Sequence, residues 1–323
     1  MAKRRYKRGS GPAAALLCLL LTLAVFFQSG RLDPENLLGP LSDLLGADGP
    51  AASQTAAQPM DGLLRLHCID VGQGDSFFLE TEDKTVLIDT GEAEYAQTVI
   101  DYIEALGYDH IDLAVATHMH SDHMGGMAEV LETLPADRFL MTGLTPDATP
   151  TTRVYETLLD ALENSPDTEV LAAEPGEQFP LAEGVTLTVL GPVEDYDDLN
   201  LTSVVCRVDA GERSFLFTGD MEKKAEQALL DAGADLRADV LKVGHHGAST
   251  SSSPAFLAAV SPRCSVIPVG EGNSYGHPTP QTLERLEAYG PVYRTDLLGN
   301  IRFETDGVTL RVESDRGGEE EIE

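Results

Sequence analysis

Six consecutive residues, His118-Met119-His120-Ser121-Asp122-His123, constrain the fold of this chain more than any other feature of its sequence. An apolar run at residues 111–116, typical of a buried strand, precedes them, and a helix-like run at residues 127–134 follows. The segment is therefore predicted to lie on a strand-to-helix loop, where α/β scaffolds usually carry functional groups. Three imidazoles and one carboxylate on so short a loop indicate a divalent metal site. The alternative, a polar loop that carries three of the chain's eight histidines by chance, accounts poorly for this density.

The spacing within the segment predicts two points of convergence. Alternate residues of an extended segment point the same way, so His118 and His120 should face one point. Asp122 and His123 should then turn toward a second point a few ångströms away. Two neighbouring dications could be held by such a loop.

Two later strand-like runs end in further candidate ligands. Asp220 ends the apolar run 215–218, where its carboxylate could bridge two dications; an ordinary strand-ending turn is the alternative. His245 and His246 follow the run 240–243. Adjacent residues point apart, so both cannot easily bind one ion. We predict His245 as the ligand and His246 nearer the substrate, with the reverse assignment as the alternative.

A third histidine and a hydroxyl-rich segment are weaker candidates. His277, within Asn273-Ser274-Tyr275-Gly276-His277-Pro278, could donate a proton or contact an oxyanion, or it could be a hydrogen-bonded loop residue. Residues 249–253 all carry hydroxyls, and Ser253 before Pro254 predicts the start of a helix. This helix start would suit a bound phosphate or serve only as a cap.

The charge of the chain limits its partners. The net charge is −32, and five of the 22 basic residues fall within the first eight positions. An acidic surface repels polyanions, which argues against tight nucleic-acid binding over a broad face. Bound dications could still reverse the field locally. The four cysteines are not in C-x-x-C spacing, so neither a disulfide framework nor a thiolate zinc cluster is indicated.

The chain divides into four predicted segments. Residues 1–30 hold five basic residues and then an apolar run at 12–27, which predicts an uncleaved membrane signal anchor or, alternatively, a cleaved signal peptide. The remainder would lie outside the membrane. Residues 31–62 read as a flexible linker, residues 63–313 as the folded domain, and residues 314–323 as an acidic tail, disordered from Gly317. Strands and helices alternate loosely in the domain, with hairpins at both ends, which predicts an α/β fold of two packed mixed sheets with outer helices, an αββα sandwich.

The H-x-H-x-D-H pattern resembles that of the metallo-β-lactamase superfamily of binuclear metal hydrolases, which has this sandwich fold. The resemblance implies that His118 and His120 belong to a first metal site, that Asp122 and His123 belong to a second, and that Asp220 bridges them. The Asp at the fourth position argues against the diiron redox branch, whose motif has Glu in place of the second His. Four stretches together are similar to the ComEC family, which is involved in DNA uptake during competence: residues 70–76, 118–123, 203–205 with 218–220, and 241–247.

Two departures from the family patterns matter. The many-helix membrane channel of full-length ComEC proteins is not found in this sequence, and one N-terminal span would not conduct DNA. Most metallo-β-lactamase hydrolases also have a His before the bridging Asp, whereas this chain has Asn200 in that region, as the ComEC branch does. An oxygen-richer first site tolerates Mn²⁺ better than one with three imidazoles.

The combined expectation is an extracytoplasmic hydrolase with two divalent ions, Zn²⁺ or Mn²⁺. Its expected activity is that of a phosphodiesterase or nuclease in which a shared hydroxide attacks phosphorus in line, and single-stranded DNA is the candidate substrate. Asp122 would hold one ion and orient the nucleophile, and His246 or His277 would stabilise the transition state. Asp89 and Asp75 would support the ligands. The alternatives are a hydrolase of another small ester, lactone or cell-wall phosphoester, and an impaired metal-binding module. The expected partners are the substrate and, through the N-terminal helix, the membrane.

Overall fold

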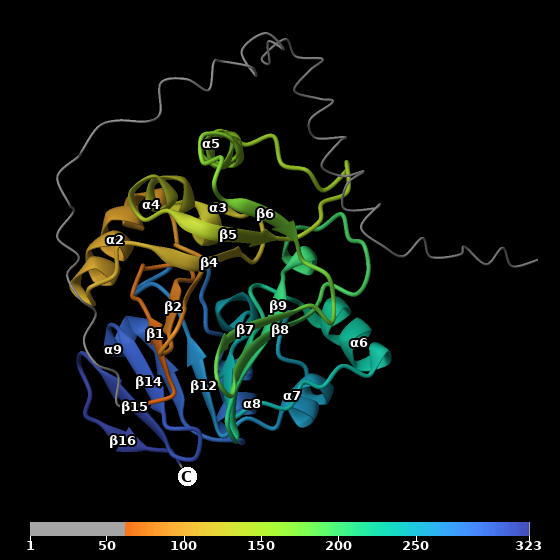
Figure 1. The fold of residues 1–323 in the computed structure, drawn as a ribbon. Helices are drawn as coiled ribbons and strands as arrows, with labels where there is room; N and C mark the ends of the chain where they lie inside the picture. The colour runs from red at the N-terminus through yellow and green to blue at the C-terminus, as the bar shows by residue number, and fades with distance from the viewer. Residues whose placement is uncertain (1–61, 323) are drawn as a thin grey trace, which may run out of the picture. The chain divides into compact units, whose positions relative to one another are not determined.

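Two mixed β-sheets pack face to face in the described part of the chain, residues 62–322 of a computed structural model (Figure 1). Helices cover the outer face of each sheet, so the predicted αββα sandwich is confirmed. The predicted anchor at 1–30 and, except for its last residue, the predicted linker at 31–62 lie outside the described residues.

The first sheet has nine strands and changes from antiparallel to parallel pairing at β3. Hairpins join β2 to β3 and β14 to β15, β1 pairs in antiparallel fashion with the distant β14, and helices connect the parallel strands β3 to β6. Across the sheet the strands are β16 (Glu320–Glu321), β15 (Leu310–Ser314), β14 (Ile301–Thr305), β1 (Leu64–Cys68), β2 (Phe77–Glu80), β3 (Thr85–Ile88), β4 (Ile111–Ala116), β5 (Ala136–Met141) and β6 (Glu169–Ala172).

The second sheet has seven strands and the same division. Strands β7 to β10 are antiparallel, and β10 to β13 are parallel. Across the sheet the strands are β13 (Val292–Arg294), β12 (Cys264–Ile267), β11 (Val240–Lys242), β10 (Arg213–Phe217), β9 (Val205–Ala210), β8 (Val185–Gly191) and β7 (Gln178–Ala182).

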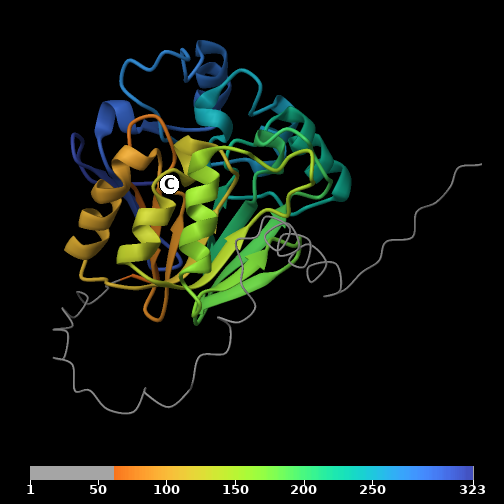
Figure 2. The ribbon, with the colours of Figure 1, turned by 90° about the horizontal axis from the view of Figure 1, so that it is seen from above.

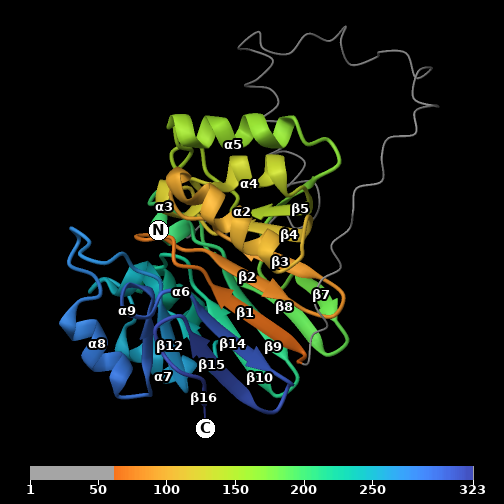
Figure 3. The same ribbon diagram turned by 90° about the vertical axis from the view of Figure 1, so that its left-hand side faces the viewer.

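Helices α2 (Ala96–Ala105), α4 (Met127–Thr133) and α5 (Arg153–Glu163) lie side by side over the nine-stranded sheet (Figure 2). Helices α6 (Lys223–Ala232), α7 (Pro254–Val260) and α8 (Pro280–Glu287) pack on the seven-stranded sheet, and Figure 3 shows α7 and α8 on the side opposite α5. The short elements are η2 (Ala93–Tyr95), α3 (Ser121–Met124), η3 (Asn200–Thr202), η4 (Gly244–Gly247) and α9 (Thr295–Leu298). Within residues 62–322, none of the helices is both long enough and apolar enough to cross a bilayer.

The core follows from the alternation of apolar side chains along the strands. In β8 every second residue is buried, because only one face of this strand meets the other sheet. Phe77 of β2 and Phe217 of β10 meet edge to face across the two sheets, with ring centroids 5.3 Å apart. This packing fixes the two sheets, so that loops from the ends of both come together at one edge.

The sequence expectations differ from the structure at two places. Residues 169–172 and 178–182 form strands that were not predicted. For β6 the reason is that it is a partly exposed edge strand without apolar alternation. The acidic tail, expected to be disordered, instead forms β16 beside β15. Ile322 explains the order, since its side chain is only 7% exposed and its N–H donates to Leu310 O at 2.8 Å. The predicted helix start at Ser253 is confirmed, with its side chain accepting from Phe256 N.

Candidate metal centre

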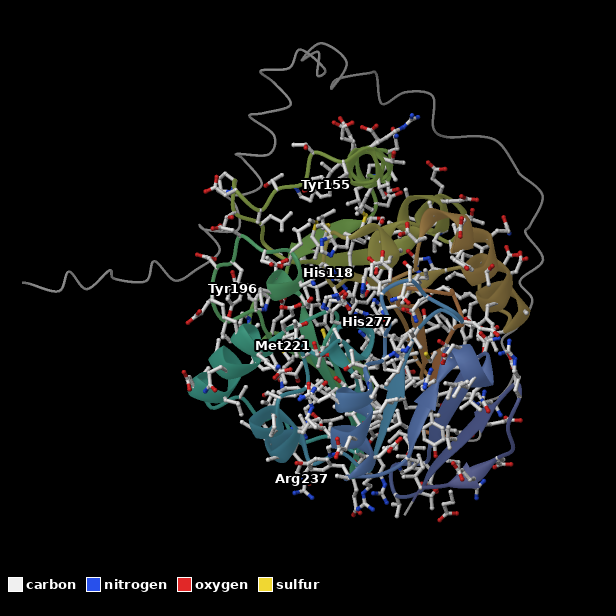
Figure 4. All side chains as sticks on the ribbon, turned by 180° about the vertical axis from the view of Figure 1, so that it is seen from behind. His118, Tyr155, Tyr196, Met221, Arg237 and His277 are labelled. Carbon is white, nitrogen blue, oxygen red and sulfur yellow. The ribbon has the colours of Figure 1, made fainter. Side chains whose placement is uncertain are left out.

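The metal-binding candidates lie on four loops that follow four strands. Asp89 follows β3, the His118–His123 segment follows β4, Asp220 follows β10, and the pair His245 and His246 follows β11. Strand β3 is parallel to β4 in one sheet, and β10 is parallel to β11 in the other. The loops that follow these strands therefore emerge at the same edge of the two sheets. Figure 4 shows His118 and His277 in this region and Arg237 at the opposite end of the seven-stranded sheet.

His123 is held by Asp89 and directed at Asp220. Its Nδ1 lies 2.8 Å from Asp89 Oδ2, and a proton donated from Nδ1 to this carboxylate leaves Nε2 as the atom that binds a metal once its own proton is lost. Thr117 binds the same carboxylate, through its N–H at 2.8 Å and its hydroxyl at 2.6 Å. The Nε2 of His123 lies 3.2 Å from Asp220 Oδ1. Both atoms are buried, and neither has a hydrogen-bond partner.

His246 is held in the same way by a backbone carbonyl. Its Nδ1–H donates to Pro268 O at 2.9 Å, and its Nε2 lies 3.3 Å from Asp122 Oδ2 and 3.6 Å from Asp220 Oδ2. Ligand atoms of Asp122, His123, Asp220 and His246 all lie within 4.8 Å of one another. Two fixed imidazole lone pairs and two carboxylates that share one point are the donor set of a divalent ion. The unpartnered Nε2 of His123 and Oδ1 of Asp220 show that these residues fit a metal.

The other predicted pair lies beside this group. His118 Nε2 and His120 Nδ1 are 3.0 Å apart, and the rings of His118 and His123 have centroids 4.2 Å apart. Burial, and then the neighbouring His123, lower the pKa of His118 well below its usual value. The neutral imidazole, which is the form that binds metals, is therefore favoured at His118. The structure thus brings His118 and His120 together at a point next to the first group.

The charges around the group attract a cation. Burial lowers the pKa of His123, but the carboxylates of Asp220, Asp75 and Asp89 outweigh it and raise this pKa well above the usual value. The pKa of Asp220 is held well below its usual range, because His246 and His123 offset the cost of burial. A metal ion that replaced the proton on His123 would meet the same carboxylates, because metal binding and protonation compete for one ring nitrogen.

His245 lies outside the group. Its Nδ1 is 2.9 Å from Glu222 Oε1, its Nε2 is 3.8 Å from Asp220 Oδ2, and its side chain is 25% exposed. The structure therefore places His246, and not the predicted His245, among the four converging residues. The reason is local: His245 and His246 both have positive φ, 49° and 50°, and this tight turn directs the second ring inward.

Comparison with known proteins identifies the fold family. The sequence model of the metallo-beta-lactamase superfamily matches residues 69–271. This chain belongs to the metallo-beta-lactamase superfamily. A solved structure of a mutant CmlA beta-hydroxylase, a protein of Streptomyces venezuelae, has a TM-score of 0.50 at 16% identity, covering 76% of this chain and 55% of that one. At this identity the likeness shows the shared fold alone.

Two curated relatives confirm the resemblance to competence proteins. The chain is 36% identical over 239 residues to "Competence protein ComA" of Neisseria gonorrhoeae and 29% identical over 255 residues to "ComE operon protein 3" of Bacillus subtilis (strain 168). These matches cover 72% and 73% of this chain but 31% and 32% of the relatives. The chain therefore spans about a third of the length of the curated relatives that it matches.

His277 and Asn200 complete the rim of this superfamily site. The rings of His277 and His245 pack edge to face with centroids 5.4 Å apart, and His277 Nδ1 is buried without a partner. Burial and the neighbouring His245 lower the pKa of His277. Asn200 Nδ2 lies 3.4 Å from His245 Nδ1, and Asn200 Oδ1 is buried and unpartnered. Asn200, in the region that the resemblance compares with the His of most superfamily hydrolases, is thus next to His245 at the rim.

Sequence reasoning missed Lys242, the last residue of β11. Its side chain is only 1% exposed, and its Nζ lies 2.5 Å from Asp75 Oδ2, 2.6 Å from Gly219 O and 3.6 Å from Asp220 Oδ1. Burial lowers the pKa of Lys242, but Asp75 and Asp220 outweigh it and raise the pKa above its usual value. The available signal was a lysine within the apolar run 240–243, which a strand buried on both faces does not otherwise tolerate.

Proposed function

We propose that this protein is an extracytoplasmic metal-dependent phosphodiesterase that cleaves nucleic-acid strands. The convergence of Asp122, His123, Asp220 and His246, with the His118–His120 pair beside them, is the observation that carries the proposal. The similarity to competence proteins supports a nucleic-acid substrate. The basic and then apolar start of the sequence supports a location outside the cytoplasm.

The candidate ligands are sufficient for two ions. Asp122, His123 and His246 would hold one ion, His118 and His120 the other, and Asp220 would contact both. Bound Zn²⁺ or Mn²⁺ supplies Lewis-acid chemistry, offsetting charge on the phosphoryl oxygens and lowering the pKa of water. Asn200, whose Nδ2 lies next to His245, has a buried and unpartnered amide oxygen, which supports Mn²⁺ as an alternative to Zn²⁺.

The chain's own residues orient these ligands and set the charge of the site. Asp89 and the carbonyl of Pro268 keep the rings of His123 and His246 in one tautomer and one orientation. Four carboxylates lie in or beside the site: Asp75 and Asp220 contact the ammonium of Lys242, Asp89 holds His123, and Asp122 faces His246. Two dications and the ammonium of Lys242 would offset the charge of these four carboxylates, so the site would not repel a phosphodiester anion as the rest of the acidic protein does.

The rim residues would contact the leaving group of the proposed substrate. His277 and His245 form one wall of the site, and the unpartnered Nδ1 of His277 is available to a substrate oxygen. A hydrogen bond from His277 to the leaving oxygen would stabilise the charge that develops there.

The deciding experiment is a substrate panel. The purified full-length chain is stripped of metal, reloaded with Mn²⁺ or Zn²⁺, and assayed with single-stranded DNA, bis-p-nitrophenyl phosphate and nitrocefin. We expect turnover of the two phosphodiesters and none of nitrocefin, and loss of turnover in Asp122→Ala with an unchanged circular dichroism spectrum. Turnover of nitrocefin alone would instead favour a lactam or ester hydrolase. Fewer than one bound ion per chain would favour a non-enzymatic module.

A further inference from the structure

Tyr275 has the most exposed side chain among the large hydrophobic residues of the described part of the chain, at 70%. Tyrosine usually buries its ring and leaves only the hydroxyl in water, because the ring dominates its transfer free energy. An exposed ring on the loop that carries His277 is therefore a candidate for contact with a ligand.

Tyr275 is the outer end of a row of rings that leads to the metal centre. It stacks on His277, with ring centroids 5.8 Å apart and ring planes 25° apart. His277 in turn packs edge to face on His245 at 5.4 Å, and His245 Nε2 lies 3.8 Å from Asp220 Oδ2. The tyrosine is thus two ring-to-ring steps from a histidine that borders the metal ligands.

Asn273 makes this loop rigid. Its Oδ1 accepts the backbone N–H groups of Tyr275, at 3.2 Å, and His277, at 3.1 Å. Its Nδ2 donates to the carbonyls of Gly270, at 3.1 Å, and His277, at 2.6 Å. One side chain therefore fixes four backbone groups on both sides of Tyr275. A preorganised ring loses little conformational entropy when a ligand stacks on it.

The loop that carries Tyr275 and His277 packs against two of the loops that form the metal centre. Gly270 N donates to Gln73 Oε1 at 3.2 Å, next to the turn that supplies Asp75. Thr279 N donates to Gly247 O at 3.0 Å, directly after His246. A Cβ on Gly247 would lie 2.6 Å from Pro278 Cβ, so the two segments are in close contact. The position of Tyr275 is therefore coupled to the site that would hold the metal.

We propose that Tyr275 is a stacking platform for an unpaired nucleobase next to the phosphodiester that is cleaved. This subsite rests on the proposed function and adds a binding determinant to it. The chain has a net charge of −32, so contacts between phosphates and basic side chains contribute little attraction over most of its surface. Stacking needs no charge and tolerates any base, and a base within a duplex has its faces covered by its neighbours. The subsite therefore selects single strands.

The test compares two oligonucleotides of equal length, one of thymidines and one of abasic tetrahydrofuran residues. For the wild type we expect a lower KM with the thymidine strand. Tyr275→Ala should raise that KM about 5- to 100-fold and leave kcat within a factor of about two. The KM of the abasic strand should not change, and Tyr275→Phe should behave as the wild type, because the ring is kept.

The matched control is Tyr289→Ala. Tyr289 is also partly exposed, but it lines a cavity of about 380 Å³ with Arg237 and Arg263, at the other end of β11. This variant should leave the KM of both strands unchanged. The thermal unfolding midpoint of each variant is also measured. A midpoint equal to that of the wild type shows that the comparison is between folded proteins.

Two results would overturn the subsite: an unchanged thymidine KM in Tyr275→Ala, or an equal rise for both strands, which would indicate a general disturbance of the loop. If the wild type cleaves neither strand, phosphodiesterase activity is absent and the test becomes equilibrium binding of fluorescein-labelled strands. Binding of the thymidine strand that Tyr275→Ala weakens would then support the platform without the reaction. Equal binding by both proteins, or none, would overturn it.

Discussion

The two walls of the metal centre differ in how their side chains are held. The inner wall is almost fully buried, and its candidate metal ligands are held by further hydrogen bonds and ion pairs. It consists of Asp75, Asp89, His123, Asp220, Lys242 and His246. The outer wall contains His245 and Glu222, which are about a quarter exposed and bind each other at 2.9 Å, and then His277 and Tyr275. The inner wall is therefore arranged before an ion arrives, whereas the outer wall has polar groups that a substrate can engage.

The difference predicts which wall controls which property. Residues of the inner wall should determine metal affinity and stability, because removing one leaves buried charges without partners. Residues of the outer wall should determine the rate and the choice of substrate, because the metal remains bound without them. Each experiment below tests one side of this division.

The largest effect is expected for Asp220→Asn. Asp220 is the only one of the four converging residues whose carboxylate oxygens lie near both His123 and His246, at 3.2 and 3.6 Å. Its removal should lower phosphodiester turnover by at least ~10³-fold, since Lewis-acid catalysis contributes several kcal/mol. Metal content by mass spectrometry and kcat/KM are measured together. The control is Asp231→Asn at an exposed position of α6. An Asp220→Asn variant that keeps a tenth of the activity would contradict the assignment.

Lys242→Met tests whether the inner wall needs its buried cation. The substitution leaves Asp75 and Asp220 buried without the ammonium that lies 2.5 and 3.6 Å away. Removing one partner of a buried ion pair costs about 3–5 kcal/mol, and we expect this loss in urea unfolding of the metal-free protein. Bound divalent ions should recover part of it, because they supply positive charge to the same carboxylates.

Lys223→Met is the control for this prediction. Lys223 donates from Nζ to Ser249 O at 2.7 Å on the exposed side of the site, so its loss should change stability by less than about 0.5 kcal/mol. Equal unfolding midpoints for Lys242→Met and the wild type would show that the buried carboxylates do not depend on Lys242.

The adjacent residues His245 and His246 belong to different walls, His245 to the outer wall and His246 to the inner wall. His246→Ala should lower metal affinity by at least about 10- to 100-fold, because His246 Nε2 faces Asp122 and Asp220. His245→Ala should keep the metal and lower kcat by a smaller factor, because its ring contacts Glu222 and His277 instead. Titration with Zn²⁺ against a competing chelator measures the affinity. A stronger loss of affinity in His245→Ala would restore the assignment made from the sequence.

The sequence predicted most clearly what depends on local patterns. The apolar run before His118 and the turn at Ser253 and Pro254 each reflect one strand or one helix end, and each appears in the structure. Strand β6 was missed because it is an edge strand whose side chains are partly exposed, so burial imposes no alternation on it.

The choice between His245 and His246 could not be derived from periodicity. Strand alternation only says that adjacent side chains diverge, and the positive φ of both residues decides which one points inward. Lys242 was missed for a different reason: its partners, Asp75 and Asp220, come from distant parts of the chain. Long-range pairing of this kind is set by the packing of the two sheets and not by any local pattern.

The smallest expected effect concerns Glu80, a buried carboxylate outside the metal centre that contrasts with those inside it. Burial alone would raise the pKa of Glu80, but hydrogen bonds from His67 and Tyr108 and the nearby Arg65 lower it to about 2. A lowered folded-state pKa means that the stabilisation is complete above the unfolded value near 4.5 and is lost as the pH falls toward 2. Glu80→Gln should therefore lower the unfolding free energy by about 1–2 kcal/mol at pH 7 and by almost nothing at pH 2, in both cases independently of added metal. A metal-dependent effect at Glu80, which lies apart from the converging ligands, would show that the division between the buried ion pairs and the metal centre is wrong.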